Sequence, residues 1–250
     1  MIETILITGG TGKVGKQLIK HFSQKDFNLL FTGMYQEEIN NLLNTIKSDN
    51  LKGLSIDLME EKSFEKIISF INENKLYPTT LINCARSLNF LKVDKDGITQ
   101  RKEWLSEFTL DVVVPYEISM ALANQKSSKL KNIINISSIY GIVSANPNLY
   151  KNPKTDSPIQ YGVAKASLIH LTKELAVRLA EQNIKVNSIS YGGIEGRVDD
   201  EFKTKYAKLC PLKRMLTEEE VVGAVDFLVS NYSSYITGHN MVVDGGWSVW

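Results

Sequence analysis

The sequence predicts an α/β fold, a doubly wound sheet of seven parallel strands covered by helices on both faces, in a single domain that spans residues 1–250. Two observations predict it. Short apolar runs alternate with longer segments of helical period along the whole chain, an order that favours parallel strands joined by right-handed crossovers. The length of 250 residues also suits one α/β domain, and the chain contains no internal repeat or low-complexity linker.

The expected elements follow one another regularly. Strands are predicted at about 2–8, 27–32, 51–57, 79–84, 131–137, 184–190 and 240–244. Helices are predicted where apolar residues recur every three or four positions, at 14–24, 36–47, 62–74, about 101–125, 161–182 and 217–230. Two long loops interrupt this order, at about 142–160 and 192–213. Both follow strands, so we expect them to bind the substrate at the carboxyl edge of the sheet, where open α/β folds bind ligands.

The first loop carries a phosphate-binding pattern. Its sequence, GGTGKVG at 9–15, directly follows the first strand and opens the first helix. Glycines let the backbone approach a pyrophosphate, and the helix N-terminus supplies unpaired N–H groups. Strand, glycine turn and helix together indicate a dinucleotide-binding, Rossmann-type site. A glycine-rich turn without a ligand is the alternative.

Tyr161 and Lys165 lie four positions apart at the start of a predicted helix, and therefore on one face of it. An ammonium beside a phenol stabilises the phenolate, which lets such a phenol take or give a proton near neutral pH. The pair is a candidate acid/base, and an ordinary helix surface is the alternative.

Charge and composition argue against several classes of function. Lys and Arg number 29 against 28 Asp and Glu, with no basic block, so no nucleic-acid partner is expected. We find no secretory signal pattern, and no apolar run approaches the roughly 20 residues that span a bilayer. Cys84 and Cys210 are expected to be free thiols of a cytoplasmic protein. The three histidines lack metal-ligand spacing, so no metal site is expected.

Seven motifs follow one another along the chain. They are TGGTGKVG at 8–15, DL at 57–58, NCA at 83–85, ISS at 136–138, YGVAK at 161–165, VNSI at 186–189, and ITG at 236–238 with DGG at 244–246. In this order the whole chain resembles the short-chain dehydrogenase/reductase family in its shorter form. The resemblance implies an enzyme that transfers a hydride between NAD(P) and a secondary alcohol or ketone.

The resemblance also implies roles for single residues. Tyr161 is the expected acid/base, Lys165 its support and a ligand of the nicotinamide ribose, and Ser138 the partner of the reacting oxygen. Ser138 as a simple turn cap is the alternative. Asp111 stands where the family has a catalytic asparagine that orders a water. The expected cofactor-binding residues are Gly9, Thr11, Gly12, Lys13, Val14, Asp57, Leu58, Asn83, Ala85, Tyr161, Lys165 and Ile194.

The chain departs from the family pattern at several positions. Lys13 replaces a glycine of the turn, Asp111 the asparagine, Arg86 the glycine after N-x-A, Tyr191 a proline and Gly196 a threonine, and the loop at 146–158 adds about ten residues. No carboxylate or arginine follows the second strand, so the choice between NAD and NADP stays open.

The substrate is expected to be a small molecule bound by a cationic rim. Its residues are Arg86, Tyr150, Lys151, Lys154 and Arg197, which suit a phosphate or carboxylate. Solvated loop lysines are the alternative. A narrower resemblance, to oxidoreductases of bacterial flagellin-modification and sialic-acid-like sugar pathways, implies a sugar or sugar-phosphate derivative.

Two other functions stay open. An NAD(P)-retaining epimerase or dehydratase suits the G-x-x-G-x-x-G spacing, although the chain leaves no room for the additional substrate domain of such enzymes. A non-catalytic dinucleotide-binding sensor suits the departures at Asp111, Arg86 and Tyr191. The helices predicted at 101–125 and 161–182 are apolar around much of their circumference, so we expect a homotetramer or homodimer.

Overall fold

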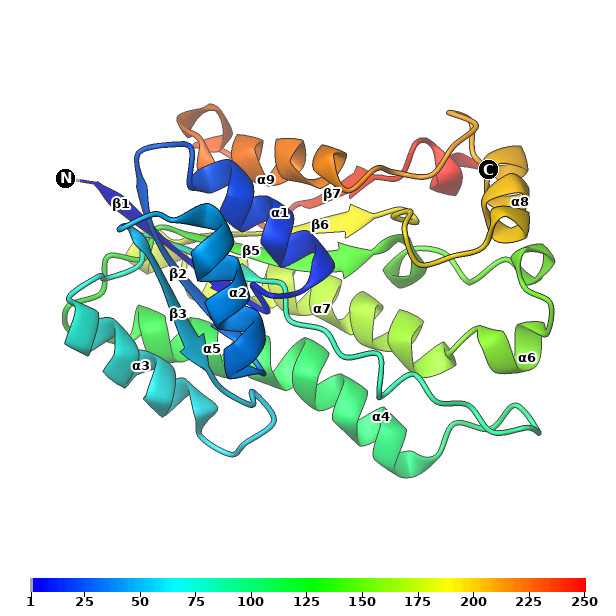
Figure 1. Cartoon of the computed structure of the whole chain (residues 1–250), viewed down its shortest axis with the longest axis horizontal. Helices are drawn as coiled ribbons and strands as arrows, with labels where there is room; N and C mark the ends of the chain where they lie inside the picture. Colours follow the sequence, from blue (N-terminus) through cyan, green and yellow to red (C-terminus); the bar gives the residue numbers. More distant parts are fainter. Residues whose placement is uncertain (1) are drawn as a thin grey trace.

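The computed structural model, which describes residues 2–250, contains one parallel sheet (Figure 1). Its strands are β1 (Glu3–Thr8), β2 (Phe27–Gly33), β3 (Leu51–Ser55), β4 (Thr80–Asn83), β5 (Asn132–Ser138), β6 (Lys185–Tyr191) and β7 (Asn240–Val243). They pair in the order β3-β2-β1-β4-β5-β6-β7, every pair parallel. The predicted seven-stranded, doubly wound sheet is confirmed.

Helices cover both faces of this sheet, as Figure 1 shows. They are α1 (Lys13–Phe22), α2 (Gln36–Ile46), α3 (Ser63–Asn74), α4 (Arg101–Phe108), α5 (Val114–Ala123), α6 (Pro153–Asp156), α7 (Ile159–Arg178), α8 (Asp200–Leu209) and α9 (Val222–Val229). On one face α1, α2 and α9 enclose an apolar core that includes Leu18, Ile39 and Val225. On the other, α3, α5 and α7 enclose a second core. Strands buried on both faces explain the continuous apolar runs in the sequence.

The helix predicted at about 101–125 differs from the prediction in its middle. A π turn, Thr109–Val113, separates α4 from α5. Pro115 has no N–H group, and its ring crowds the carbonyl four residues earlier, that of Asp111. The helix therefore widens at this point, and the widened turn carries Asp111. π turns inside helices occur often at functional sites.

Each of the two long loops contains a helix. The loop at 142–160 includes α6, and the loop at 192–213 includes α8. In Figure 1 both helices lie beyond the arrowheads of β5 and β6. A third apolar cluster there includes Ile139, Leu149, Tyr206 and Trp247. Since the loops after β1 and β4 also leave the sheet at this edge, where the strand order reverses, the fold gathers the motifs that end or follow β1, β3, β4 and β5 at one edge. The VNSI motif lies within β6, and the ITG motif precedes β7.

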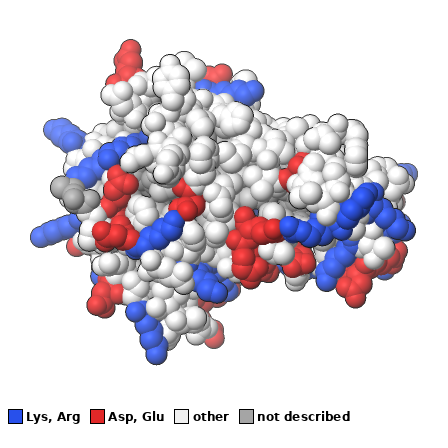
Figure 2. All heavy atoms as spheres, turned by 90° about the horizontal axis from the view of Figure 1, so that it is seen from above, with Lys and Arg blue, Asp and Glu red and all other residues white. Residues whose placement is uncertain are grey.

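The surface carries charges of both signs. In the view of Figure 2, basic and acidic side chains are interspersed, consistent with the net charge of +1. Among residues 2–250, no helix combines the length and apolar character needed to cross a membrane.

Candidate active site

The glycine turn after β1 is held by backbone hydrogen bonds to β2. The Gly10 N–H donates to the Thr32 carbonyl at 2.7 Å, and the Gly9 N–H donates to Thr32 Oγ1 at 3.2 Å. Gly9 has a φ of +67°, and a Cβ there would lie 2.5 Å from Ala85 Cα. A Cβ on Gly15 would lie 2.3 Å from the Gly9 carbonyl oxygen. The turn is therefore a tight cradle of backbone that only glycine permits at these two positions.

The residues at this edge fit a dinucleotide. No side chain caps α1, which begins at Lys13 after Gly12, so its first N–H groups are available to an anion. Thr8 Oγ1 accepts from the N–H groups of Cys84 and Ala85 at 3.1 and 3.3 Å, which fixes the N-x-A segment beside the cradle. Asn83 Oδ1 is buried and has no hydrogen-bond partner among residues 2–250. A cradle, unpaired helix N–H groups and a buried free acceptor together suit the predicted ligand.

Other predicted cofactor residues lie around the same edge with partners of their own. Asp57 follows β3, and its Oδ1 accepts from the Met59 N–H at 2.9 Å, as a turn former would. Lys13 donates to the Glu195 carbonyl and lies 3.2 Å from Glu218 Oε1. Its ammonium therefore ties α1 to the loop after β6, the loop that also carries Ile194.

The remaining three predicted cofactor residues are Thr11, Val14 and Leu58. Thr11 lies against Gly33 at the end of β2, where a glycine Cβ would be 2.7 Å from the threonine methyl group. Val14 packs against the core under α1, and Leu58 against the core on the opposite face of the sheet.

Ser138 and Tyr161 are presented by adjoining backbone segments, although they stand 23 positions apart in the sequence. Ser138 ends β5, and its Oγ accepts from the Tyr140 N–H at 3.2 Å, so the predicted capping role is present as well. The turn after Ser138 packs on the start of α7. A Cβ on Gly141 would lie 2.8 Å from the carbonyl carbon of Lys165, and one on Gly162 would lie 2.9 Å from the Tyr140 carbonyl oxygen.

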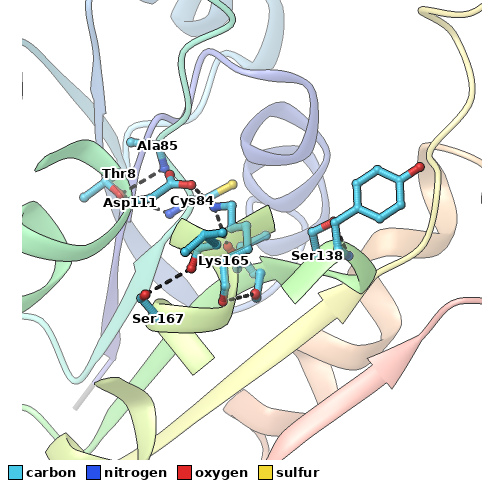
Figure 3. Close-up of polar contacts among 11 residues, drawn as sticks. Thr8, Cys84, Ala85, Asp111, Ser138, Lys165 and Ser167 are labelled. Carbon is cyan, nitrogen blue, oxygen red and sulfur yellow. Dashed lines mark hydrogen bonds and ion pairs between the residues drawn. The ribbon is translucent and has the colours of Figure 1, made fainter. Parts of the chain in front are cut away.

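Lys165 is the buried centre of the site (Figure 3). Its Nζ donates to the Ile136 carbonyl at 3.1 Å, lies 3.0 Å from Asp111 Oδ2, and is 5.8 Å from the centroid of the Tyr161 ring. Burial acts to lower the pKa of Lys165, but the charges of Asp111 and Tyr161 outweigh it and raise that pKa above its usual value. The departure at Asp111 therefore gives Lys165 a carboxylate partner, and the lysine stays charged.

A further acidic residue, Glu107, was missed by the sequence reasoning. It lies in α4, four residues before Asp111, and is 1% exposed. Burial in the first place, and the Asp111 charge in the second, raise the pKa of Glu107 to about 7. The signal available in the sequence was its position four residues before Asp111 in a predicted helix.

The predicted cationic rim is only partly assembled. The guanidinium carbon of Arg86, whose side chain is exposed, lies 4.5 Å from the centroid of the Tyr161 ring. Lys151 instead pairs with Asp199 at 3.6 Å and Glu201 at 3.2 Å, which joins the loop at 142–160 to α8. Arg197 and Lys154 are exposed. Arg86 is thus the cation that lies at the candidate acid/base.

Four aromatic side chains, which the sequence did not predict to lie together, form an aromatic wall beyond β5 and β6. The hydroxyl oxygens of Tyr140 and Tyr150 are 2.6 Å apart, and the rings of Tyr206 and Trp247 stack with centroids at 4.4 Å. Tyr191 does not belong to this wall. It is 3% exposed, and its hydroxyl donates to the Val221 carbonyl in the core beneath α9, so its replacement of a proline serves packing.

Comparisons with known proteins agree with this geometry. A family model described as enoyl-(acyl carrier protein) reductase, of the short-chain alcohol dehydrogenase type, matches residues 13–248. The chain is 28% identical to post-translational flagellin modification protein A of Campylobacter coli, over 99% of this chain and 98% of that protein. It is 28% identical to a 3-oxoacyl-(acyl-carrier-protein) reductase of Aquifex aeolicus, over 96% and 95% of the two chains.

A solved structure is similar over nearly the whole chain. A short-chain dehydrogenase of Leptospira borgpetersenii with bound NAD+ superposes with a TM-score of 0.87 at 29% identity, covering 99% of this chain and 93% of that one. The family match extends far beyond half of the sequence, and the fold and motif order agree with it. The chain belongs to the short-chain dehydrogenase/reductase family of NAD(P)-dependent oxidoreductases.

Proposed function

We propose that the protein transfers a hydride between NAD(P) and a secondary alcohol or ketone of a small sugar derivative that carries a carboxylate or phosphate. The observation that carries the anionic part of this proposal is the position of Arg86, 4.5 Å above the Tyr161 ring. Among residues 2–250, Arg86 has no salt bridge to a carboxylate. An arginine left without an acidic partner beside the acid/base suits a planar anion on the substrate.

The bound cofactor supplies or accepts the hydride, and side chains of the protein transfer the proton. In this proposal Tyr161 takes the proton from the alcohol oxygen, or gives one to the ketone oxygen, and Ser138 Oγ holds that oxygen in place. Lys165 stabilises the phenolate form, since its ammonium is near the ring. Arg86 anchors the far anionic group and so orients the reacting carbon.

A sugar derivative is favoured by the similarity to the flagellin modification protein. The similarity to an acyl-carrier-protein reductase, at the same identity, names a different substrate class. A neutral thioester acyl chain has no anionic group for Arg86 to bind. The polar and aromatic wall formed by Tyr140, Tyr150 and Tyr206 also suits a polyhydroxylated substrate better than an alkyl chain.

The test is a spectrophotometric assay of nicotinamide oxidation and reduction with sugar acids, sugar phosphates, nucleotide sugars and acyl thioesters, using NAD and NADP in turn. We expect turnover with an anionic sugar. Arg86→Gln should raise KM for that substrate by roughly ten- to a hundredfold, the worth of a charge-assisted pair. It should leave KM for a neutral analogue unchanged. Lys154→Gln, which removes an exposed cation from α6, is the control.

Other outcomes decide between the alternatives. Product formation without net change of the cofactor would show an epimerase or dehydratase. Cofactor binding without turnover of any substrate would show a sensor. Equal KM increases for anionic and neutral substrates in Arg86→Gln would remove the anion anchor from the proposal.

We also propose that the protein acts as a homotetramer or homodimer in the cytoplasm. Large apolar side chains on the helical faces of α4, α5 and α7 are exposed in the single chain, among them Leu105, Tyr116, Ile159 and Val177. The free thiols Cys84 and Cys210 suit a reducing compartment. A sedimentation mass of one chain, 28.1 kDa, at micromolar concentration would contradict the self-association.

A further inference from the structure

A second buried carboxyl group lies next to the site, and the reaction proposed above leaves it without a role. Glu107 lies four residues before Asp111, and only 1% and 2% of the surfaces of these residues are exposed. The Asp111 side chain is near enough for its charge to act on the Glu107 carboxyl group. Two ionised carboxylates that act on each other in a buried place repel, whereas a proton on one of them lets it donate a hydrogen bond to the other. Glu107 Oε1 has no hydrogen-bond partner among residues 2–250.

A small cavity lies between Asp111 and Lys165. Its volume is about 10 Å³, close to what one water needs, and its polar lining comes from Thr8, Asn83, Asp111 and Lys165. Asp111 therefore lines the cavity, and its Oδ2 is 3.0 Å from the Lys165 ammonium, while its charge also acts on Glu107. Figure 3 shows Asp111 and Lys165 close to each other. The separation of Asp111 and Lys165 is short enough for a proton to pass between them.

We propose that Glu107 and Asp111 share one proton and that this pair is a proton store for Tyr161, reached through Lys165. The inference rests on the proposed oxidoreductase function. When Tyr161 gives its proton to the substrate oxygen, Lys165 returns one to the phenolate, and the pair replaces the proton on Lys165. An O–H bond at the pair breaks as an N–H bond at Lys165 forms, and the pair later takes a proton from water. In alcohol oxidation the same transfers run in reverse.

The charges around Glu107 support this role. The charged groups that act on it are Asp111 in the π turn, Lys165 in α7 and Arg86 after β4. Glu103, one turn earlier on the same helix, is also buried. Burial and Asp111 raise the pKa of Glu107 to about 7, against the opposing effects of Lys165 and Arg86. Proton exchange is efficient when the pKa of the group is near the working pH. Glu107 does not line the cavity beside Lys165, so it is a positioning residue that acts through Asp111 and Lys165.

The first test needs no substrate. In the cofactor-free protein labelled at the glutamate side-chain carboxyl carbon, NMR should show one resonance that titrates near pH 7, and this resonance should be absent in Glu107→Gln. In Asp111→Asn the titration should move to lower pH because the neighbouring negative charge is gone. Glu103→Gln, which removes another buried carboxyl of the same helix, should leave it in place. A Glu107 resonance that titrates with the exposed glutamates would overturn the proposal.

Stability gives a second measurement that is independent of turnover. Because folding raises the pKa of Glu107 above its ordinary value of 4.5, the folded state holds a proton that the unfolded chain releases. Stability from this group is therefore full at low pH and falls as the pH rises from about 4.5 to about 7. Thermal unfolding of the wild type should show this decline, and Glu107→Gln should lose it. An equal decline in both proteins would count against a raised Glu107 pKa.

The third test separates this proposal from the proposed function. Turnover of ketone by the wild type should fall as the pH rises above about 7, where the pair has lost its proton. Glu107→Gln should lower turnover by roughly tenfold or more, with KM little changed, and remove this pH dependence. Glu103→Gln should keep the wild-type profile. An unchanged profile in Glu107→Gln would overturn the proton store and leave the oxidoreductase function standing, whereas a wild type without turnover but with the NMR titration would do the opposite.

Discussion

The two halves of the active-site edge differ in whether backbone or side chains form them. At the cofactor half, between β1 and β4, backbone forms the site: the glycine turn is fixed by hydrogen bonds to β2, and a single Cβ at Gly9 or Gly15 would collide with backbone. At the substrate half, beyond β5 and β6, side chains from distant loops form it, such as Tyr150 and Tyr206. A site formed by closely packed backbone tolerates almost no substitution. A site formed by side chains can be altered by replacing one residue at a time. This difference explains how one fold keeps its cofactor and varies its substrate.

The largest effect is expected at the boundary of the two halves, at Tyr161. Tyr161→Phe removes the hydroxyl and keeps the ring, so the contact with Arg86 and the fold should survive. Turnover should fall by roughly 100- to 10,000-fold, the worth of a positioned acid/base. Cofactor affinity, measured by the fluorescence of bound reduced nicotinamide, should stay the same. If the variant keeps more than about a tenth of wild-type turnover, Tyr161 is not the proton carrier and Asp111 is the next candidate.

Adding a single side-chain carbon to the glycine turn should impair cofactor binding by the whole turn. In Gly15→Ala the new Cβ would lie 2.3 Å from the Gly9 carbonyl oxygen and 2.7 Å from Gly10 Cα, so the turn must open. We expect cofactor affinity to fall by about tenfold or more, which corresponds to about 1.4 kcal/mol of lost binding free energy. Gly223→Ala is the matched control, since a Cβ there meets nothing within 4 Å. It should bind cofactor as the wild type does, and equal affinities for the two variants would contradict the cradle.

The same difference decides what could be predicted from the sequence. Local patterns such as GGTGKVG and the spacing of Tyr161 and Lys165 lie within one turn or one helix, so their geometry followed from secondary structure alone. The seven strands and their parallel direction followed from the alternation of short apolar runs with helical segments. The π turn at Thr109–Val113 did not, because it depends on how Pro115 distorts a helix that the periodicity predicts as regular.

Contacts between segments that are distant in the sequence could not be predicted from local patterns either. Lys13 binds Glu195 and Glu218, far away in the sequence. Lys151 likewise pairs with Asp199 and Glu201. Both lysines were expected to face a ligand, and both bind neighbouring acidic or carbonyl groups. Arg86 was distinguished from them by its position directly after a strand and its N-x-A motif, because a residue there is oriented by the sheet.

The smallest effect is expected within the substrate half, where a single hydroxyl is removed. Tyr150→Phe deletes the hydroxyl that lies 2.6 Å from that of Tyr140, and the Tyr140 hydroxyl, in the third apolar cluster, loses this partner. A hydrogen bond of this kind contributes about 0.5–1.5 kcal/mol, so KM for the substrate should rise by roughly two- to tenfold while cofactor affinity stays constant. Lys151→Gln, a change in the neighbouring residue at an exposed ion pair, should alter neither quantity measurably. A loss of cofactor affinity in Tyr150→Phe would show that the two halves of the edge are coupled, and would break the distinction between a backbone-built and a side-chain-built site.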